Sequence, residues 1–369
     1  MRRSTVKARV RPLATIGLLA AACTASEPAS QEPSSSAPFA TTPGTSASPS
    51  PVEHVNVAFI RDSSVPDGDE HALPALQGAE LAFRTAVIAD PDAVPIDLVP
   101  VDVGEDPAAL ETIRSDPLLV AAIVAPGVEV DVPAGIPVLS LSGLASASED
   151  GVRLVPPLAT PARALARSVR EAPCILSEDP PPDPFGAVVA RRSGERAEAI
   201  DVAEVAAVVS DRGCRTVVWV GGPDAAADAA DALEDVPVRL VGGDRLLDHD
   251  FLAEASGSAE GARAFCPCTD VSTSTAFAAR RFIQDYQSEF GSAPGAYAVE
   301  GWDAAHLVLR AARGAAATRE EVAAWLGGVA AHDGLATTYR FGSDGELLDP
   351  DATVRVYRVV GGRWVSAPS

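Results

Sequence analysis

Short apolar runs alternate with stretches of helical periodicity along most of this chain, and the alternation constrains the fold more than any other feature. The first apolar runs cover residues 55–60, 96–103, 119–126 and 136–142. Helical patterns separate the first three of them, around residues 76–86 and around residues 107–114. Repetition of strand, helix and strand predicts a parallel sheet with helices on both faces.

The pattern then restarts with a second set of apolar runs, at residues 173–179, 186–192, 214–222, 237–244 and 262–268. Two long helices are expected next, over 276–291 and 299–314, the first with Phe277, Phe282 and Tyr286 as apolar anchors. The tail is expected to end in a pair of strands resembling a β-hairpin. A chain of 369 residues suffices for two such α/β lobes. Two facing lobes would hold a small molecule between the carboxyl ends of their strands.

Residues 1–22 have the order of a secretory signal peptide: a basic start, an apolar stretch from Leu13 to Leu19, and then small residues. The apolar stretch is shorter than the roughly 20 residues that a membrane-spanning helix needs. Cys23 follows at once, and residues 19–23 resemble the lipobox of bacterial lipoproteins, whose cysteine is acylated after cleavage. We therefore expect a lipid on Cys23 and a position on the outer face of the bacterial cell membrane. The alternative is an ordinary secreted protein with a cysteine near the cleavage site.

Residues 23–53 are expected to form the lipid anchor and a disordered spacer, because Ser, Pro, Thr and Ala dominate and little apolar surface is present. Acidic residues outnumber basic ones by 51 to 29, and the formal net charge is −22 at pH 7. A field of this sign repels nucleic-acid phosphates and anionic membrane surfaces. No nucleic-acid partner is therefore expected, and membrane attachment is expected through Cys23 alone.

Four stretches carry a resemblance to a known family: VNVAFIRDSS…ALQGAELAF, AAIVAPG…AGIPVLSLSGLAS, FIQDYQSEFGSAPGAYAVEGWDAAHLVLRAA, and HDGLATTYRFGSDGEL…VRVYRVVGGRW. The chain resembles the type I periplasmic solute-binding proteins of the leucine/isoleucine/valine-binding kind, the receptors of branched-chain amino acid ABC importers. The resemblance implies two Rossmann-like lobes with parallel sheets, joined by a hinge that the chain crosses three times. Lobe one would comprise residues 54–160 plus 271–336, and lobe two residues 161–270 plus 337–369.

The resemblance also implies a function. The lobes would close on a small polar ligand, amino-acid-like or amide-like, and deliver it to a membrane permease. The alternative is a sensory or protein-docking lipoprotein that keeps the fold without transporting a solute. Within the resemblance, only PPPDPF separates the runs at 173–179 and 186–192. A parallel crossover needs a dozen or more residues, so the family's helix at this point is expected to be deleted.

Asp244 falls on the acid that binds the ligand ammonium in this family, and a carboxylate at a strand end suits that task. The family's carboxylate-binding hydroxyls are missing, because the loop at 126–131 has no serine and Leu144 stands in place of a threonine. The hydroxyl groups that could bind a polar ligand instead belong to Ser140, Ser142, Ser63 and Ser64. Capping of local turns is the alternative role for all four. Tyr297, Trp302 and Asp303 resemble helix-packing residues of the family.

Neither a metal site nor an enzyme is expected. The five histidines show no metal-binding spacing. The sequence also contains no phosphate-binding glycine loop, no G-x-G-x-x-G and no G-x-S-x-G nucleophile motif. No cofactor is therefore expected.

Four further cysteines, Cys174, Cys214, Cys266 and Cys268, suggest disulfides in an exported protein. Cys174 and Cys214 open strands that neighbour each other in a 2-1-3 order, so their Cα atoms could reach bridging distance. That pairing leaves Cys266 and Cys268 to each other, across a single proline. A swapped pairing stays open, as does a zinc site of four thiolates.

Overall fold

The structure is a computed structural model that describes residues 54–65, 68–90, 94–144, 147, 150–169, 173–178, 184–255, 257–272, 274–312 and 318–367. These residues belong to one compact unit, residues 50–369. The expected signal peptide, Cys23 and the spacer lie outside the described residues. Every helix in the described part is too short or too polar to cross a bilayer.

The first sheet has the strand order β2-β1-β3-β4-β5, and all neighbouring strands in it are parallel. Every residue of its central strand β3 is buried, as expected where helices cover both faces. The order 2-1-3-4-5 is that of a doubly wound fold, in which ligands bind beyond the carboxyl ends of the strands. The strands are β1 (Val55–Arg61), β2 (Ile96–Asp102), β3 (Leu119–Val124), β4 (Val138–Ser140) and β5 (Val152–Arg153).

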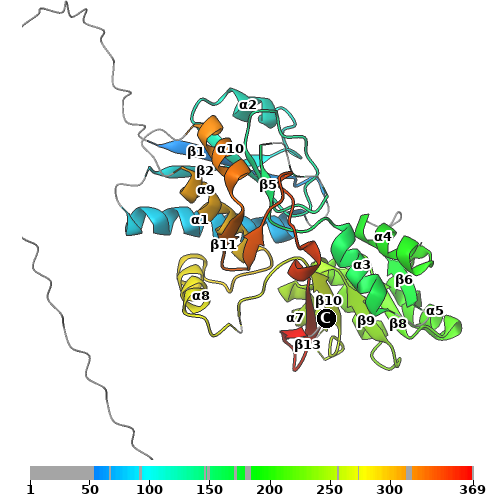
Figure 1. The fold of residues 1–369 in the computed structure, drawn as a ribbon. Coiled ribbons are helices and arrows are strands. Elements are labelled where there is room, and N and C mark those ends of the chain that lie inside the picture. The colour runs from blue at the N-terminus through cyan, green and yellow to red at the C-terminus, as the bar shows by residue number, and fades with distance from the viewer. Residues whose placement is uncertain are drawn as a thin grey trace, which may run out of the picture. The chain divides into compact units, whose positions relative to one another are not determined.

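Two helices of this layer lie between the strands in sequence, and three come from much later in the chain (Figure 1). The early ones are α1 (Gly68–Ala89) and α2 (Ala109–Ser115); the late ones are α8 (Phe277–Phe290), α9 (Ala298–Ala311) and α10 (Arg319–Gly328). Helix α9 packs along α1, and α10 packs against α9 and β3. The α1–α9 contact requires glycine on both sides. A Cβ atom on Gly78 would clash with the carbonyl oxygen of Ala298, and one on Gly301 with that of Ala75.

The second sheet has the order β14-β13-β10-β9-β8-β6-β7. Its strands β6 to β10 are parallel, and β13 and β14 extend the sheet antiparallel beyond β10. The strands are β6 (Pro173–Ser177), β7 (Ala197–Ala199), β8 (Thr216–Trp219), β9 (Arg239–Gly242), β10 (Arg263–Cys266), β13 (Arg355–Val359) and β14 (Trp364–Ala367). Its helices are α3 (Ala159–Ser168), α4 (Pro184–Ser193), α5 (Val205–Arg212), α6 (Pro223–Ala232) and α7 (His249–Ala255).

The chain passes between the two sets of elements three times, as the fold prediction requires. It leaves the first sheet after β5, returns from β10 to α8, and enters the second sheet again at β13. A small two-stranded sheet, β11 (Ala331–Asp333) and β12 (Thr338–Arg340), precedes the last passage. Asp303 of α9 holds the turn between these strands, since it accepts hydrogen bonds from Leu335 N (2.6 Å) and Tyr339 Oη (3.0 Å).

The prediction of a strand over 186–192, and with it of a deleted crossover helix, was wrong. This segment belongs to helix α4, which begins at Pro184 and is the crossover between β6 and β7. Its buried residues Phe185, Gly186 and Val189 follow helical spacing, and Arg191 and Arg192 occupy the last turn. The run of apolar residues is too short to separate a strand from a buried helix by periodicity.

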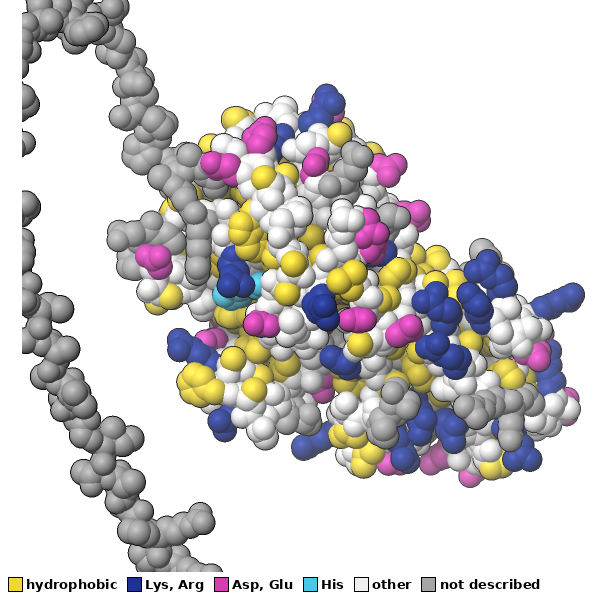
Figure 2. All heavy atoms as spheres, viewed as in Figure 1, with side chains coloured by type: hydrophobic (Ala, Val, Ile, Leu, Met, Phe, Trp, Pro, Cys, Tyr) yellow, Lys and Arg dark blue, Asp and Glu magenta, His cyan; other side chains and the backbone are white. Residues whose placement is uncertain are grey.

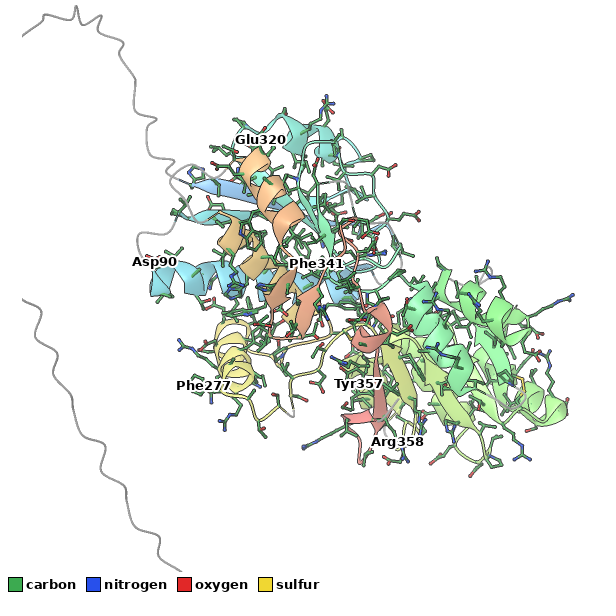
Figure 3. All side chains as sticks on the ribbon, viewed as in Figure 1. Asp90, Phe277, Glu320, Phe341, Tyr357 and Arg358 are labelled. Atoms are coloured by element: carbon green, nitrogen blue, oxygen red, sulfur yellow. A yellow bond between two sulfur atoms is a disulfide. The ribbon has the colours of Figure 1, made fainter. Side chains whose placement is uncertain are left out.

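Phe277 was also predicted wrongly as an apolar anchor of α8. Its side chain, at the first residue of the helix (Figure 3), is 75% exposed. Phe282 and Tyr286 are both buried. Positions 282 and 286 are one helical turn apart and therefore share a face, which packs on α1 and α9. Phe277 precedes them by more than a turn and extends beyond that contact.

Candidate ligand-binding site

A cavity of about 180 Å³ lies where the carboxyl ends of strands from both sheets meet. The loops after β1, β3 and β4 contribute Asp62, Gly127 and Gly143, and the loops after β9 and β10 contribute Asp244 and Pro267. This is the position at which a doubly wound fold binds its ligands. The volume falls below the roughly 300–1,000 Å³ of sites for drug-sized molecules, so the cavity suits a small ligand.

Most of the cavity wall is apolar. The side chains that line it include Val128, Leu141, Leu144, Leu158 and Phe185. Leu144 stands where the resembling family has a threonine, and it is part of this wall. These residues offer a ligand dispersion contacts and burial of apolar surface, but no hydroxyl group.

Asp244 directly follows β9 and opens a single turn of 3₁₀ helix, Asp244–Leu246. The chain reaches this point through Gly242, where a Cβ atom would press against the side chain of Leu246. The tight turn directs the Asp244 carboxylate into the cavity lining. The structure therefore places the acid predicted from sequence at the cavity.

Tyr297 reaches Asp244 from the other set of elements. Its phenol donates a hydrogen bond to the Asp244 carboxylate, and the ring of His71 meets the Tyr297 ring edge-on at 5.2 Å. His71 Nε2 lies 3.3 Å from the carbonyl oxygen of Asp244. Burial and the neighbouring Asp244 charge raise the pKa of Tyr297 well above its usual value, so the phenol keeps its proton.

The backbone of Tyr297 is left-handed, with φ = 65°, and no other non-glycine residue in the described segments has a positive φ. Such a conformation is uncommon for a bulky side chain and persists where surrounding structure fixes it. Tyr297 belongs to the hydrophobic core, as expected, and it also lines the cavity. Trp302 does pack between helices, against Phe282 at a ring distance of 5.2 Å. Asp303 instead accepts hydrogen bonds from the turn between β11 and β12, including one from Ala336 N at 2.8 Å, so its expected role in helix packing was wrong.

The four serines named from sequence contribute less directly. Ser140 and Ser142 are buried, and their side-chain oxygens bond to local backbone: Ser142 N donates to Ser140 Oγ (3.1 Å) and Leu144 N to Ser142 Oγ (3.2 Å). Ser63 and Ser64 are exposed, and neither lines the cavity. Their contacts are those of capped turns, and a role in ligand binding stays a prediction for all four.

Asp62, His71 and Arg245 line the cavity but were not singled out from the sequence. Asp62 accepts hydrogen bonds from Ser64 N (2.9 Å) and Ser64 Oγ (2.6 Å). The loop after β1 therefore contributes a carboxylate to the cavity lining, while the Ser64 hydroxyl is bonded within the loop. Arg245 directly follows Asp244 in sequence. Adjacency to residues that were named was the only signal for Asp62 and Arg245.

A buried acid lies close to Asp244. Burial, together with the negative charges of Asp248 and Asp244, raises the pKa of Glu70 to about 9. Glu70 is therefore protonated at neutral pH. The carboxylates in the cavity lining are those of Asp244 and Asp62. Their charge favours a cationic group on a ligand.

The cysteines of the second sheet form two disulfides, Cys174–Cys214 with a Cα–Cα distance of 5.8 Å and Cys266–Cys268 with 5.1 Å. Cys174 lies in β6 and Cys214 precedes the neighbouring strand β8, which is the arrangement expected from the 2-1-3 order. Pro267, between the second pair, is part of the cavity lining. Groups of three or more potential metal ligands are absent from the described residues.

Comparison with solved structures finds the same fold in many proteins, although no family model and no curated protein sequence matches this chain. A leucine-binding protein, LivK, from Thermotoga maritima has a TM-score of 0.66 at 14% identity, over 85% of this chain and 98% of that chain. LivJ from Streptococcus pneumoniae, a branched-chain amino acid transporter substrate-binding protein solved with isoleucine, has 0.65 at 17%, over 85% and 100%.

A third neighbour is an ABC transporter substrate-binding protein from Desulfitobacterium hafniense in complex with leucine, with a TM-score of 0.64 at 16% identity over 85% of this chain and 100% of that chain. At these identities the similarity shows the fold alone. The chain has the type I periplasmic-binding-protein fold, with two α/β lobes, which confirms the fold predicted from its sequence.

Proposed function

We propose that this chain is the extracytoplasmic solute-binding lipoprotein of an ABC importer, tethered to the cell membrane by a lipid on Cys23. Its two lobes, with the boundaries expected from sequence, close on a small ligand and present it to a membrane permease. The observation that carries this proposal is the cavity at the carboxyl ends of both sheets, where Asp244 and Tyr297 meet from different lobes.

The lining supports an amino-acid-like or amide-like ligand with an apolar body. Asp244 offers an acceptor for an ammonium or amide N–H group, and Arg245 beside it offers a cation for a carboxylate or carbonyl oxygen. The apolar wall around Leu141 and Leu144 suits a hydrocarbon side chain. Both polar contacts come from the loop after β9, which replaces the hydroxyl groups that the family resemblance predicted in the other lobe.

Thermal unfolding of the full chain in the presence of amino acids, amides, amines and sugars tests the proposal. A ligand that binds only the folded state increases the free energy of unfolding, by about 2.7 kcal/mol at a hundredfold excess over Kd. The unfolding temperature rises as a result. One chemical class is expected to stabilise the protein. Absence of any shift across the panel would reject solute binding.

The second candidate is a sensory or docking lipoprotein without a solute. The largely apolar wall and the local backbone hydrogen bonds of Ser140 and Ser142 favour it. This candidate function predicts that no solute stabilises the protein. It also predicts that a protein partner binds Asp244→Asn as well as it binds the parent.

A further inference from the structure

Four arginines gather at the edge of the second sheet opposite to Asp244. Arg239 begins β9, Arg263 begins β10, Arg358 lies in β13, and Arg215 directly precedes β8. Together they line a second cavity of about 550 Å³. Because parallel strands begin at one edge and end at the other, this cavity is separate from the candidate ligand site.

The strand register places three of these side chains on one face of the sheet. Arg263 and Arg358 are direct partners in the antiparallel pair β10–β13. Arg263 is also the partner of Val241 in the parallel pair β9–β10, and Arg239 precedes Val241 by two residues. Residues two apart in a strand share a face, so Arg239 lies on the same face as Arg263 and Arg358.

Arg215 joins the group through the backbone, since Arg239 N donates to Arg215 O at 3.2 Å. Figure 2 shows basic side chains gathered below the part of the molecule where Figure 1 labels β8 and β9, and Figure 3 labels Arg358 at this edge. The other charged residues in the cavity lining are Glu234 and Glu260. The Glu260 carboxylate accepts a hydrogen bond from Gly361 N at 2.8 Å.

The positive charges of Arg239, Arg263 and Arg358 are poorly compensated. Among the described residues, none of the carboxylates forms an ion pair with Arg239, Arg263 or Arg358. The buried Nε atom of Arg263 has no hydrogen-bond partner. Burial and the like charges of Arg239 and Arg358 lower the pKa of Arg263. Like charges directly opposite each other in a sheet are destabilising, and a chain with a net charge of −22 has many acids that could have neutralised them.

We propose that Arg215, Arg239, Arg263 and Arg358 form a binding site for a ligand that carries phosphate groups. Guanidinium groups bind phosphate oxygens in a bidentate fashion, and several arginines around one polar cavity match an anion of more than one negative charge. A phosphate-bearing solute and the headgroup of an anionic phospholipid share this chemistry.

Calorimetric titration of the full chain with inorganic pyrophosphate tests the site. We expect binding that weakens with added salt. In Arg239→Gln/Arg358→Gln the affinity is expected to fall by at least about 10-fold, because loss of a charged hydrogen bond weakens binding by about tenfold or more. Arg280→Gln/Arg281→Gln in α8 removes the same charge at exposed positions far from this cavity in the fold, and should bind pyrophosphate like the parent. If the first double variant fails to fold, Arg358→Gln alone, at an exposed position, replaces it.

Sedimentation with phosphatidylglycerol vesicles, against phosphatidylcholine vesicles as reference, distinguishes the two sources. Retention on the anionic vesicles that is lost in Arg239→Gln/Arg358→Gln, without pyrophosphate binding, assigns the site to headgroups. Pyrophosphate binding alone assigns it to a solute. The proposal is overturned if neither probe binds, or if the α8 double variant loses binding as much as the arginine-cluster variant.

Discussion

The Tyr297 phenol donates a hydrogen bond to the carboxylate of Asp244, 53 residues earlier in the chain. Tyr297 stands at the start of α9, which packs on the first sheet's helix α1, whereas Asp244 follows β9 of the second sheet. One hydrogen bond therefore joins the two lobes at the wall of the candidate ligand cavity.

Asp244→Asn is expected to weaken binding of an amine-bearing ligand by roughly 10- to 100-fold, because it removes one charged hydrogen bond. Calorimetric titration with the ligand found by thermal screening measures the change. Asp228→Asn, at an exposed position of α6, removes the same charge away from the cavity and serves as the control. Equal affinity of the Asp244 variant and the parent would remove Asp244 from the site.

Tyr297→Phe keeps the ring but loses the hydrogen bond to a charged acceptor. The free energy of unfolding is expected to fall by about 1.5–3 kcal/mol. Tyr286→Phe is the matched control, because its phenol donates to the neutral Gln77 amide oxygen at 2.5 Å and a loss of about 0.5–1.5 kcal/mol is expected. Urea unfolding at pH 7 measures both, and a larger loss for Tyr286→Phe would contradict the prediction.

Glu300 should make stability depend on pH. Burial raises its pKa to about 8, against an ordinary value of 4.5. Between these values the unfolded chain releases the proton and the folded protein keeps it, so the contribution of Glu300 is fully present below pH 4.5 and is lost as pH rises toward 8. The free energy of unfolding should therefore decline as pH rises from 4.5 to 8. We expect this decline to be smaller in Glu300→Gln by a few kcal/mol, on the scale of ~1.36 kcal/mol per pKa unit.

Urea unfolding at pH 5 and pH 8 tests this pH dependence. Glu204→Gln, at an exposed position, is the matched control and should follow the parent. An identical decline in the parent and in Glu300→Gln would show that Glu300 does not carry the effect.

The two disulfides should differ in their effect on stability. Cys174 and Cys214 are 40 residues apart in sequence, and Cys266 and Cys268 only 2. From the entropy of loop closure, removing the first bridge with a pair of alanines is expected to cost about 4 kcal/mol, and removing the second about 1 kcal/mol. Denaturant unfolding of the two double variants compares them directly, and equal losses would show that chain entropy is not the cause.

Most of the architecture could be predicted because a buried parallel strand leaves a strong apolar signal. Eight strands correspond to apolar runs identified in the sequence: β1, β2, β3, β4, β6, β8, β9 and β10. Strand β7 could not be identified, since it is a short edge strand with two of its three residues exposed. Helix α4 was taken for a strand because its apolar run is only a few residues long.

The candidate site was predicted less completely. Asp244 could be placed because its position at a strand end matched the family, whereas Tyr297 needed the left-handed turn that directs it into the cavity. The arginine cluster depends on register between β9, β10 and β13, and pairing between strands far apart in sequence cannot be derived from composition. Net charge excluded binding of phosphate by the overall field, but it carries no information about a local concentration of charge.

Helices α1 and α9 touch backbone to backbone through Gly78 and Gly301, and the two aromatic neighbours of Asp244 are mounted on these helices. His71 lies in α1, and Tyr297 immediately precedes Ala298, whose carbonyl oxygen faces Gly78. The close contact between α1 and α9 thus fixes the positions of both rings. A single methyl group added at Gly78 would force the two helices apart. It would thereby displace both rings from Asp244, at a distance from the cavity itself.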